Sequence, residues 1–169
     1  MLTGILAGLA AHVLATAPAV ATPACAAAVA VVEDLWSKPG QPPLSAGAVA
    51  RFKSPAWKRA SELRQGGWSG PVPSDALLTL WEASPPTSAT TCGNVSAMSS
   101  AKAIDLPVDA APDSARTTIG LPVLDRSGRQ ALVQVTTRRN PIGSSVYLYH
   151  LRKTGAGWSV VSRRMLAIS

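Results

Sequence analysis

Few side chains in this 169-residue sequence are of the types that carry out covalent or metal chemistry. Its two His are His12 and His150, and His12 lies in an apolar segment that we interpret below as a targeting signal. With His150 and two Cys left, a conventional zinc site is not expected. A Ser–His–Asp triad would depend on His150, and no G-x-S-x-G turn presents a nucleophilic Ser. We therefore predict no catalytic residue, no metal, no cofactor and no enzymatic activity.

Carboxylates offer one alternative to that prediction. Asp105, Asp109 and Asp113 follow one another at four-residue spacing in a Pro-containing segment. Paired carboxylates cleave glycosidic bonds when the fold fixes their separation, and a loop does not fix it. A small periplasmic or secreted enzyme, with a cleft between helices and sheet, stays open as the alternative. A purely structural module is a third possibility.

Charge is distributed unevenly along the sequence. Residues 1–125 carry eight Lys or Arg and nine Asp or Glu, whereas residues 126–169 carry eight Lys or Arg and no acidic side chain. The net charge of +7 therefore arises in the last 44 residues. Four of these cations are our candidate anion-binding residues: Arg138, Arg139, Arg163 and Arg164.

A concentration of positive charge favours association with anions without specifying one. We expect the partner to be an anionic cell-envelope component, such as a lipid phosphate, lipopolysaccharide or teichoic acid, or an acidic protein. The alternative is a solvated face on which Arg and Lys discourage pairing between strand edges. Nucleic acid is not expected, because no nucleic-acid motif accompanies the arginines.

The N-terminal segment has the pattern of an export signal. No charged side chain precedes Glu33, residues 4–20 are largely apolar, and Ala19-Val20-Ala21 has the small-x-small form of a cleavage site. We predict a signal peptide over residues 1–21 and a secreted or periplasmic location. Alternatives are an uncleaved membrane anchor and a lipid on Cys25; the protein would associate with a membrane only in those cases.

Two Cys in an exported chain predict a disulfide. A Cys25–Cys92 bond would close a loop of 67 residues, which stabilises the fold by about 4 kcal/mol in the chain-entropy model. It would join the first helix to the middle of the chain. The disulfide and the lipid exclude each other at Cys25, and two free thiols would be expected if the chain stayed in the cytosol.

The pattern of the remaining sequence predicts one α+β domain over residues 22–169. Its helical part covers about residues 25–82, with helices at 25–36, 55–65 and 74–82, where apolar spacing, caps and breakers agree. Residues 83–115 form a loop-rich stretch with one strand at 103–108. A β-meander follows over about 117–168, with strands at 118–124, 130–139, 145–152 and 158–168. The short connections make these four strands antiparallel.

The meander can be laid out by assuming that Val146 lies opposite both Arg138 and Arg164. One face then carries the apolar side chains of the core, including Val133, Val135, Tyr147, Tyr149, Leu151, Val161 and Met165. The other face carries Arg138, Arg164 and His150 beside Leu148, Trp158 and Val160. A slip of one residue would exchange the faces of a strand.

The C-terminal segments resemble a known group of proteins. They are Ala131-Leu132-Val133-Gln134-Val135 after Asp125 and Gly128, then residues 147–153, then Gly157-Trp158-Ser159-Val160-Val161 and a final Ile168-Ser169. They are similar to the C-terminal half of small exported bacterial proteins of unknown function. The resemblance covers about the last 50 residues and implies a sheet, but no catalytic residues. Members of that group often have a Cys pair in the loop that is residues 140–144 here, and this loop has none.

Overall fold

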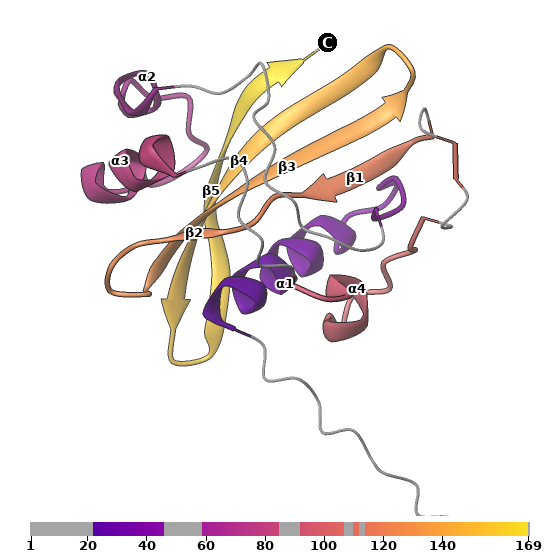
Figure 1. The fold of residues 1–169 in the computed structure, drawn as a ribbon, viewed down its shortest axis with the longest axis horizontal. Coiled ribbons are helices and arrows are strands. Elements are labelled where there is room, and N and C mark those ends of the chain that lie inside the picture. The colour runs from indigo at the N-terminus through magenta and orange to yellow at the C-terminus, as the bar shows by residue number, and fades with distance from the viewer. Residues whose placement is uncertain (1–21, 46–58, 85–91, 107–109, 112–113, 169) are drawn as a thin grey trace, which may run out of the picture.

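The computed structural model describes residues 22–45, 59–84, 92–106, 110–111 and 114–168. The predicted signal peptide, the first part of the second predicted helix, and Asp109 and Asp113 lie outside these residues. The described chain is a sheet with helices on both of its faces (Figure 1). The prediction of an α+β fold, with short helices packed on a C-terminal antiparallel meander, is confirmed.

The sheet is built from five antiparallel strands. They are β1 (Arg116–Ile119), β2 (Val123–Leu124), β3 (Gln130–Asn140), β4 (Gly143–Thr154) and β5 (Gly157–Ile168). The order is β1-β3-β4-β5, and β2 also pairs with β3. The first strand expected from sequence is split in two at Gly120–Pro122, because Pro122 has no N–H to donate to a ladder. Gly120 keeps the two halves on β3 by donating its N–H to the Gln134 carbonyl at 2.7 Å.

The register that we assumed for the meander is wrong. Ser144, not Val146, lies opposite Arg138, and Leu148 lies opposite Arg164. The pairing of β4 with β5 shifts twice, between Val146 and Tyr147 and between His150 and Leu151. Each shift places an unpaired residue on β5, and such bulges are not visible in a periodic pattern.

The shifts also change which side chains of β5 face which side of the sheet. Trp158 and Val160 pack against the core beneath α1, not on the opposite face where we placed them. Met165, which we placed in the core, is 48% exposed. Arg164 and His150 do lie on the face opposite α1, as the layout had them.

Helices cover the two faces separately (Figure 1). On one face lie α1 (Pro23–Trp36) and α4 (Val95–Met98), packed on Ala131, Val133, Val135, Tyr149 and Leu151. On the other lie α2 (Ala60–Arg64) and α3 (Asp75–Ala83), packed on Val123, Leu132, Val146, Leu148 and Leu166. Three residues of β3 (Ala131, Val133 and Val135) enter the core beneath α1, whereas Leu132 enters the other core, so this strand is buried on both faces.

Helix ends follow the capping signals of the sequence. Thr22 accepts a hydrogen bond from the Cys25 N–H at 3.3 Å, and Pro23 begins α1. Ser74 caps α3 by accepting from the Leu77 N–H at 3.4 Å. In the described residues α2 begins only at Ala60, since Arg59 has extended backbone angles.

The loop-rich stretch contains a helix that the sequence analysis missed. Asn94 caps α4 by accepting from the backbone N–H groups of Ser96 and Ala97. In place of the strand expected at residues 103–108, the described residues show a single parallel bridge between Asp105 and Leu44. Leu44 in turn bridges Thr117, so this edge of the sheet is covered.

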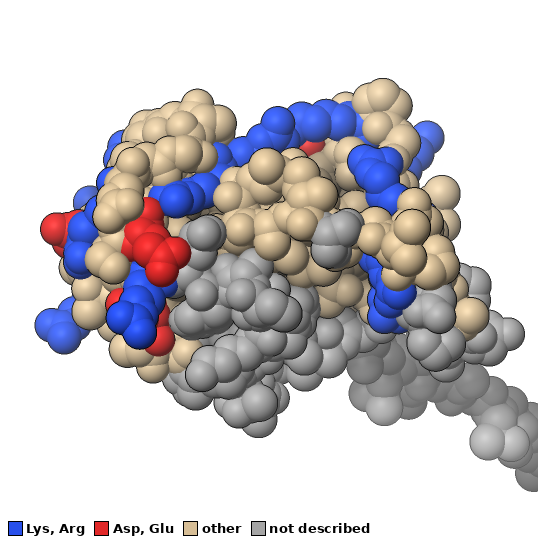
Figure 2. Space-filling model, turned by 90° about the horizontal axis from the view of Figure 1, so that it is seen from above, with Lys and Arg blue, Asp and Glu red and all other residues tan. Residues whose placement is uncertain are grey.

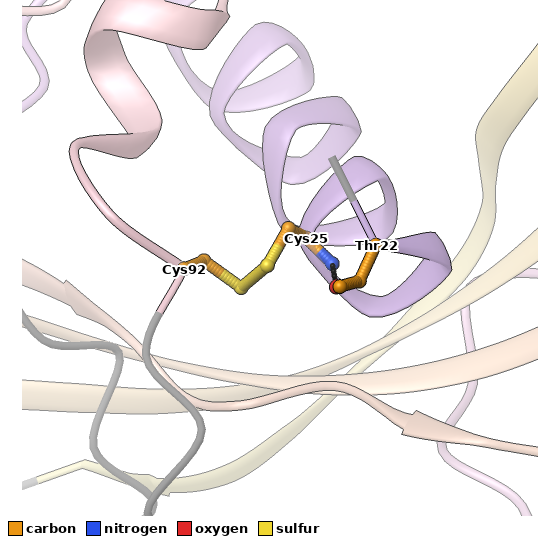
Figure 3. The surroundings of a disulfide bond; sticks show 3 residues. All are labelled: Thr22, Cys25 and Cys92. Atoms are coloured by element: carbon orange, nitrogen blue, oxygen red, sulfur yellow. Dashed lines mark hydrogen bonds between the residues drawn. A yellow bond between two sulfur atoms is a disulfide. The ribbon is translucent and has the colours of Figure 1, made fainter. Parts of the chain in front are cut away.

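The predicted disulfide is present. Cys25 in the first turn of α1 bonds to Cys92, with 5.2 Å between their Cα atoms (Figure 3). Both residues are buried, at 5% and 2% exposed. The bond leaves Cys25 no thiol to carry a lipid, and it indicates an oxidising compartment outside the cytoplasm.

Candidate anion-binding site

The four candidate arginines divide between the two faces of the sheet. Arg139 and Arg163 lie on the face that packs on α1, because Arg163 pairs with Tyr149 and β3 alternates. Arg138 and Arg164 lie on the opposite face, beneath the side covered by α2 and α3. The structure therefore separates the two pairs.

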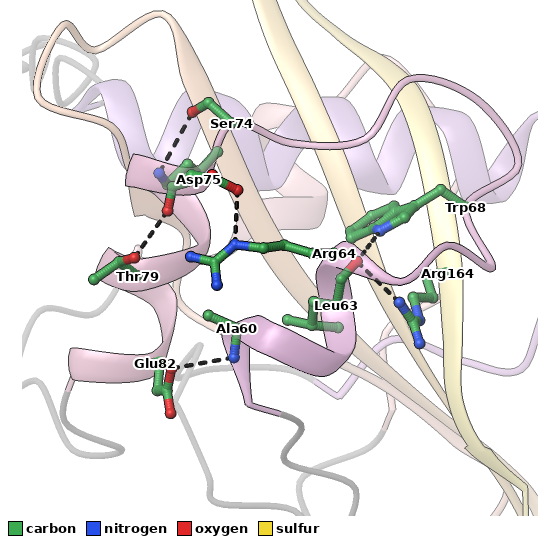
Figure 4. A network of polar contacts seen from close by, with 10 residues as sticks. Ala60, Leu63, Arg64, Trp68, Ser74, Asp75, Thr79, Glu82 and Arg164 are labelled. Atoms are coloured by element: carbon green, nitrogen blue, oxygen red, sulfur yellow. Dashed lines mark hydrogen bonds and ion pairs between the residues drawn. The ribbon is translucent and has the colours of Figure 1, made fainter.

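Arg164 is bound by backbone carbonyls. Its guanidinium Nη1 donates to the Glu62 carbonyl at 2.9 Å and to the Leu63 carbonyl at 3.0 Å. The Trp68 indole N–H donates to the same Leu63 carbonyl at 2.9 Å, and Figure 4 shows the two side chains converging there. These hydrogen bonds connect β5 to α2, so the Arg164 guanidinium binds groups of the protein itself.

Arg138 has a comparable role at the β3–β4 hairpin. Its Nη2 donates to the Pro141 carbonyl at 2.7 Å, and its Nε donates to the Asn140 carbonyl at 3.3 Å. It lines a pocket of about 470 Å³, together with Arg116, which lies directly opposite it on β1. The bonds to carbonyls direct this guanidinium at the hairpin, so we assign it a structural role.

Three other cations converge on one hollow, which we call the basic pocket. It has a volume of about 430 Å³, and its charged lining residues are Lys38, Arg139 and Arg163. Lys38 follows the end of α1, Arg139 lies near the end of β3, and Arg163 lies on β5. Tyr147 and Tyr149 of β4 also line the pocket. Arg139 and Arg163 were predicted as anion-binding residues; Lys38 was not.

The pocket exists because α1 is too short to cover the strands on which it packs. A helix of 14 residues is about 21 Å long, whereas a strand of 12 residues spans about 40 Å. The helix ends at Trp36, and the chain turns at Gly40, which has φ +75°, and runs along one side of the pocket through Gln41. The ends of β3, β4 and β5 beyond that point are left open, and the pocket lies there.

Negative groups near the pocket are fewer than positive ones. Lys38 forms an ion pair with Asp34 at 3.1 Å, and the C-terminal end of α1 adds partial negative charge. Arg139 has one weak bond, from its Nη1 to the Gly40 carbonyl at 3.5 Å. In the view of Figure 2, the Lys and Arg side chains extend across much of the surface while Asp and Glu gather mainly at one end. The pocket retains an excess of positive charge.

Tyr149, which lines the pocket, has a neutral hydroxyl. It is only 2% exposed, and burial raises the pKa of its hydroxyl above the usual 10.0, against the opposing effects of the hydrogen bond and charge of Arg163. The phenol is therefore protonated at neutral pH and adds no negative charge.

His150 does not have the surroundings of a catalytic residue. It is completely buried on the α2/α3 side, with Nδ1 3.2 Å from the Pro71 carbonyl and Nε2 3.1 Å from Gln130 Oε1. Ser162 is 3.4 Å from Nδ1, but its hydroxyl donates to the Pro71 carbonyl at 2.7 Å. Burial lowers the pKa of His150, so the ring is neutral at pH 7. No carboxylate bonds to the ring among the contacts described, and a cleft enzyme built on His150 gains no support.

Of the three candidate carboxylates, the structure describes only Asp105, and it has structural partners. The Asp105 carboxylate accepts bonds from Asn94 at 3.2 Å and from Ser96 at 2.6 Å. Within the described ranges, no three His, Cys, Asp or Glu side chains are grouped so as to hold a metal ion. The same part of the chain contains no helix with the length and apolarity needed to cross a membrane.

Comparisons of the chain with protein-family models, with curated proteins and with solved structures found no match. The resemblance of the C-terminal segments to small exported bacterial proteins therefore stays a prediction. The candidate site depends on the geometry of this chain alone.

Proposed function

We propose that the protein is an exported binding protein, without enzymatic activity, that holds an anionic component of the cell envelope at the basic pocket. The observation that carries this proposal is the convergence of Lys38, Arg139 and Arg163 from three separate elements on one open hollow. The disulfide supports a location outside the cytoplasm, where envelope anions are the abundant ligands.

The basic pocket suits an anion better than the rest of the positive surface does. Cations on separate elements surround a ligand, whereas isolated surface cations only raise its local concentration. Arg139 and Arg163 present planar guanidinium groups that can bind a phosphate or carboxylate through two parallel hydrogen bonds. The guanidinium groups of Arg138 and Arg164, in contrast, donate hydrogen bonds to backbone carbonyls.

A pair of charge-matched double variants tests the proposal. Arg139→Glu/Arg163→Glu removes the pocket cations, while Arg126→Glu/Arg129→Glu changes the net charge equally at the exposed turn before β3. Binding to anionic vesicles and to envelope fractions is measured at low salt and at 0.15 M salt. We expect at least about a tenfold loss for the pocket variant and a much smaller one for the turn variant, because cations that converge on one ligand bind it directly, whereas isolated surface cations only raise its local concentration. Equal losses in both variants would mean that net charge alone drives the binding, and no loss in either would exclude the sheet as the binding surface.

An acidic protein is the other partner that the charge pattern admits. It would be recognised in the same experiment by retention of an envelope protein, with loss of that retention after protease treatment of the fraction. In that case the pocket would still be the binding site, but the ligand would be a side-chain carboxylate.

A further inference from the structure

The uncharged lining of the basic pocket combines polar groups with apolar surface, and the polar groups restrict the kind of anion that fits. Beside the three cations, the lining residues with uncharged polar groups include Gln41, Thr137, Ser145 and Tyr147. Three of these carry hydroxyl groups and one carries an amide, and each group can both donate and accept a hydrogen bond. A wall of this composition matches a ligand whose uncharged part has many hydroxyl groups.

The lining also has a substantial apolar part. Leu35 and Ile168 contribute aliphatic surface, and the Tyr147 ring contributes an aromatic surface. This is enough for the C–H face of one sugar ring, and a volume of about 430 Å³ is within the range of small-ligand sites.

The charge of the pocket suits a phosphate monoester. Asp34 forms an ion pair with Lys38 and partly neutralises it, so Arg139 and Arg163 contribute most of the positive charge that a ligand meets. A phosphate monoester carries between about one and a half and two negative charges at pH 7 and has three acceptor oxygens. Two guanidinium groups can satisfy these oxygens through paired hydrogen bonds.

From these features we infer that the basic pocket binds a phosphate group carried by a sugar or a polyol. Arg139 and Arg163 hold the phosphate, and Gln41, Ser145 and Tyr147 hold the hydroxyl groups. The inference rests on the proposed function and adds the ligand class. The same chemistry is found in free sugar phosphates, in phosphate-bearing envelope polymers and in lipid headgroups, so the test must separate soluble from bilayer sources.

Isothermal titration of the oxidised protein is carried out with four soluble probes: inorganic phosphate, glycerol 3-phosphate, glucose 6-phosphate and glucose. We expect glucose 6-phosphate to bind about tenfold tighter than inorganic phosphate, which two additional hydrogen bonds of ordinary strength would supply. Glycerol 3-phosphate should lie between them, and glucose should show no binding at the same concentrations.

Two double variants test the binding of the phosphate group and of the hydroxyl groups separately. Arg139→Met/Arg163→Met should abolish binding of all the phosphates, whereas Gln41→Ala/Ser145→Ala should reduce glucose 6-phosphate to the level of inorganic phosphate and leave inorganic phosphate unchanged. Unfolding curves of both variants verify that the fold is intact. Should Arg163→Met disturb the buried Tyr149, the single variant Arg139→Met, at an exposed position, gives the same comparison.

Each other outcome overturns the inference in a different way. Equal affinities for inorganic phosphate and glucose 6-phosphate would remove the polyol from the ligand class. Binding to vesicles containing phosphatidic acid, with none to the soluble phosphates, would assign the site to a bilayer headgroup. If no phosphate binds but envelope fractions still bind through Arg139 and Arg163, this inference fails and the proposed function stands.

Discussion

Arg164 offers a direct test of whether the arginines of the sheet serve different purposes. Replacing it with Met keeps most of the aliphatic stem and removes two charge-assisted hydrogen bonds, to the carbonyls of Glu62 and Leu63. Hydrogen bonds from charged groups contribute about 1.5–3 kcal/mol each when buried. Arg164 is partly exposed, and the Leu63 carbonyl keeps its bond from Trp68, so both contributions are reduced. We expect Arg164→Met to lower the free energy of unfolding by about 2 kcal/mol in total.

The assay is urea unfolding of the oxidised protein, followed by Trp fluorescence, with the slope of the transition compared between variants. Arg129→Met is the matched control, because this arginine is exposed in the turn before β3 and its loss should change stability by less than about 0.5 kcal/mol. Arg164→Met should also keep its affinity for anions. If Arg164→Met lowers the free energy of unfolding no more than Arg129→Met does, the structural role of Arg164 is refuted. If Arg164→Met is stable but no longer binds anions, Arg164 belongs to the anion-binding site.

Three further predictions concern other parts of the fold. Cys25→Ala/Cys92→Ala should lower the free energy of unfolding by about 4 kcal/mol, less any structure that remains in the unfolded chain, and a loss below about 1 kcal/mol in urea unfolding would contradict the chain-entropy argument for a separation of 67 residues. Burial lowers the pKa of His150 below its usual 6.5, so on acidification the unfolded chain takes up a proton at this residue before the folded chain does. In urea unfolding, the free energy of unfolding should therefore be constant above about pH 7 and fall as the pH decreases below about 6.5. This decrease should be absent in His150→Gln. Gly70→Ala should destabilise the protein by about 1–3 kcal/mol in urea unfolding, because the added Cβ would lie 2.6 Å from the Val161 carbonyl oxygen. Gly155→Ala, with nothing within 4 Å of the added Cβ, should be neutral or slightly stabilising in the same assay.

The elements of the fold could be predicted where local chemistry determines them. The cap at Ser74 marked the start of α3 within one residue, and the apolar spacing placed the first helix at 25–36, two residues short of its start at Pro23. The even number of Cys predicted the Cys25–Cys92 bond, because only one pairing is possible. The alternation of β3 indicated a strand, although it did not show that both of its faces are buried.

Features that depend on contacts between distant segments were not predictable in the same way. The two bulges of β5 depend on its pairing with β4, and the one that leaves Val161 unpaired places Trp158 and Val160 on the other face. The carbonyl groups that Arg164 binds belong to α2, about 100 residues away, and they cannot be identified from the positions of charged residues in the sequence. Charge counting therefore identified the region rich in arginine but could not separate its structural cations from its available ones.

The basic pocket illustrates the same limit. Its position depends on the point at which α1 ends relative to strands that come more than a hundred residues later. Lys38 lies in the turn after α1, and nothing in the local sequence sets it apart from other surface lysines. The signal that could have pointed to the pocket is the shared face of Arg139, Tyr147 and Arg163, and it becomes readable only once the register of the sheet is known.

The most direct test of the central claim is to locate the bound anion. Amide chemical shifts of the ¹⁵N-labelled oxidised protein are followed during titration with inorganic phosphate at low salt. Binding at the basic pocket predicts shifts concentrated at Thr137, Ser145 and Tyr147 that saturate with a single dissociation constant. Shifts of similar size around Arg126 and Arg129, without saturation, would show that phosphate collects over the basic surface in general and would contradict a defined site.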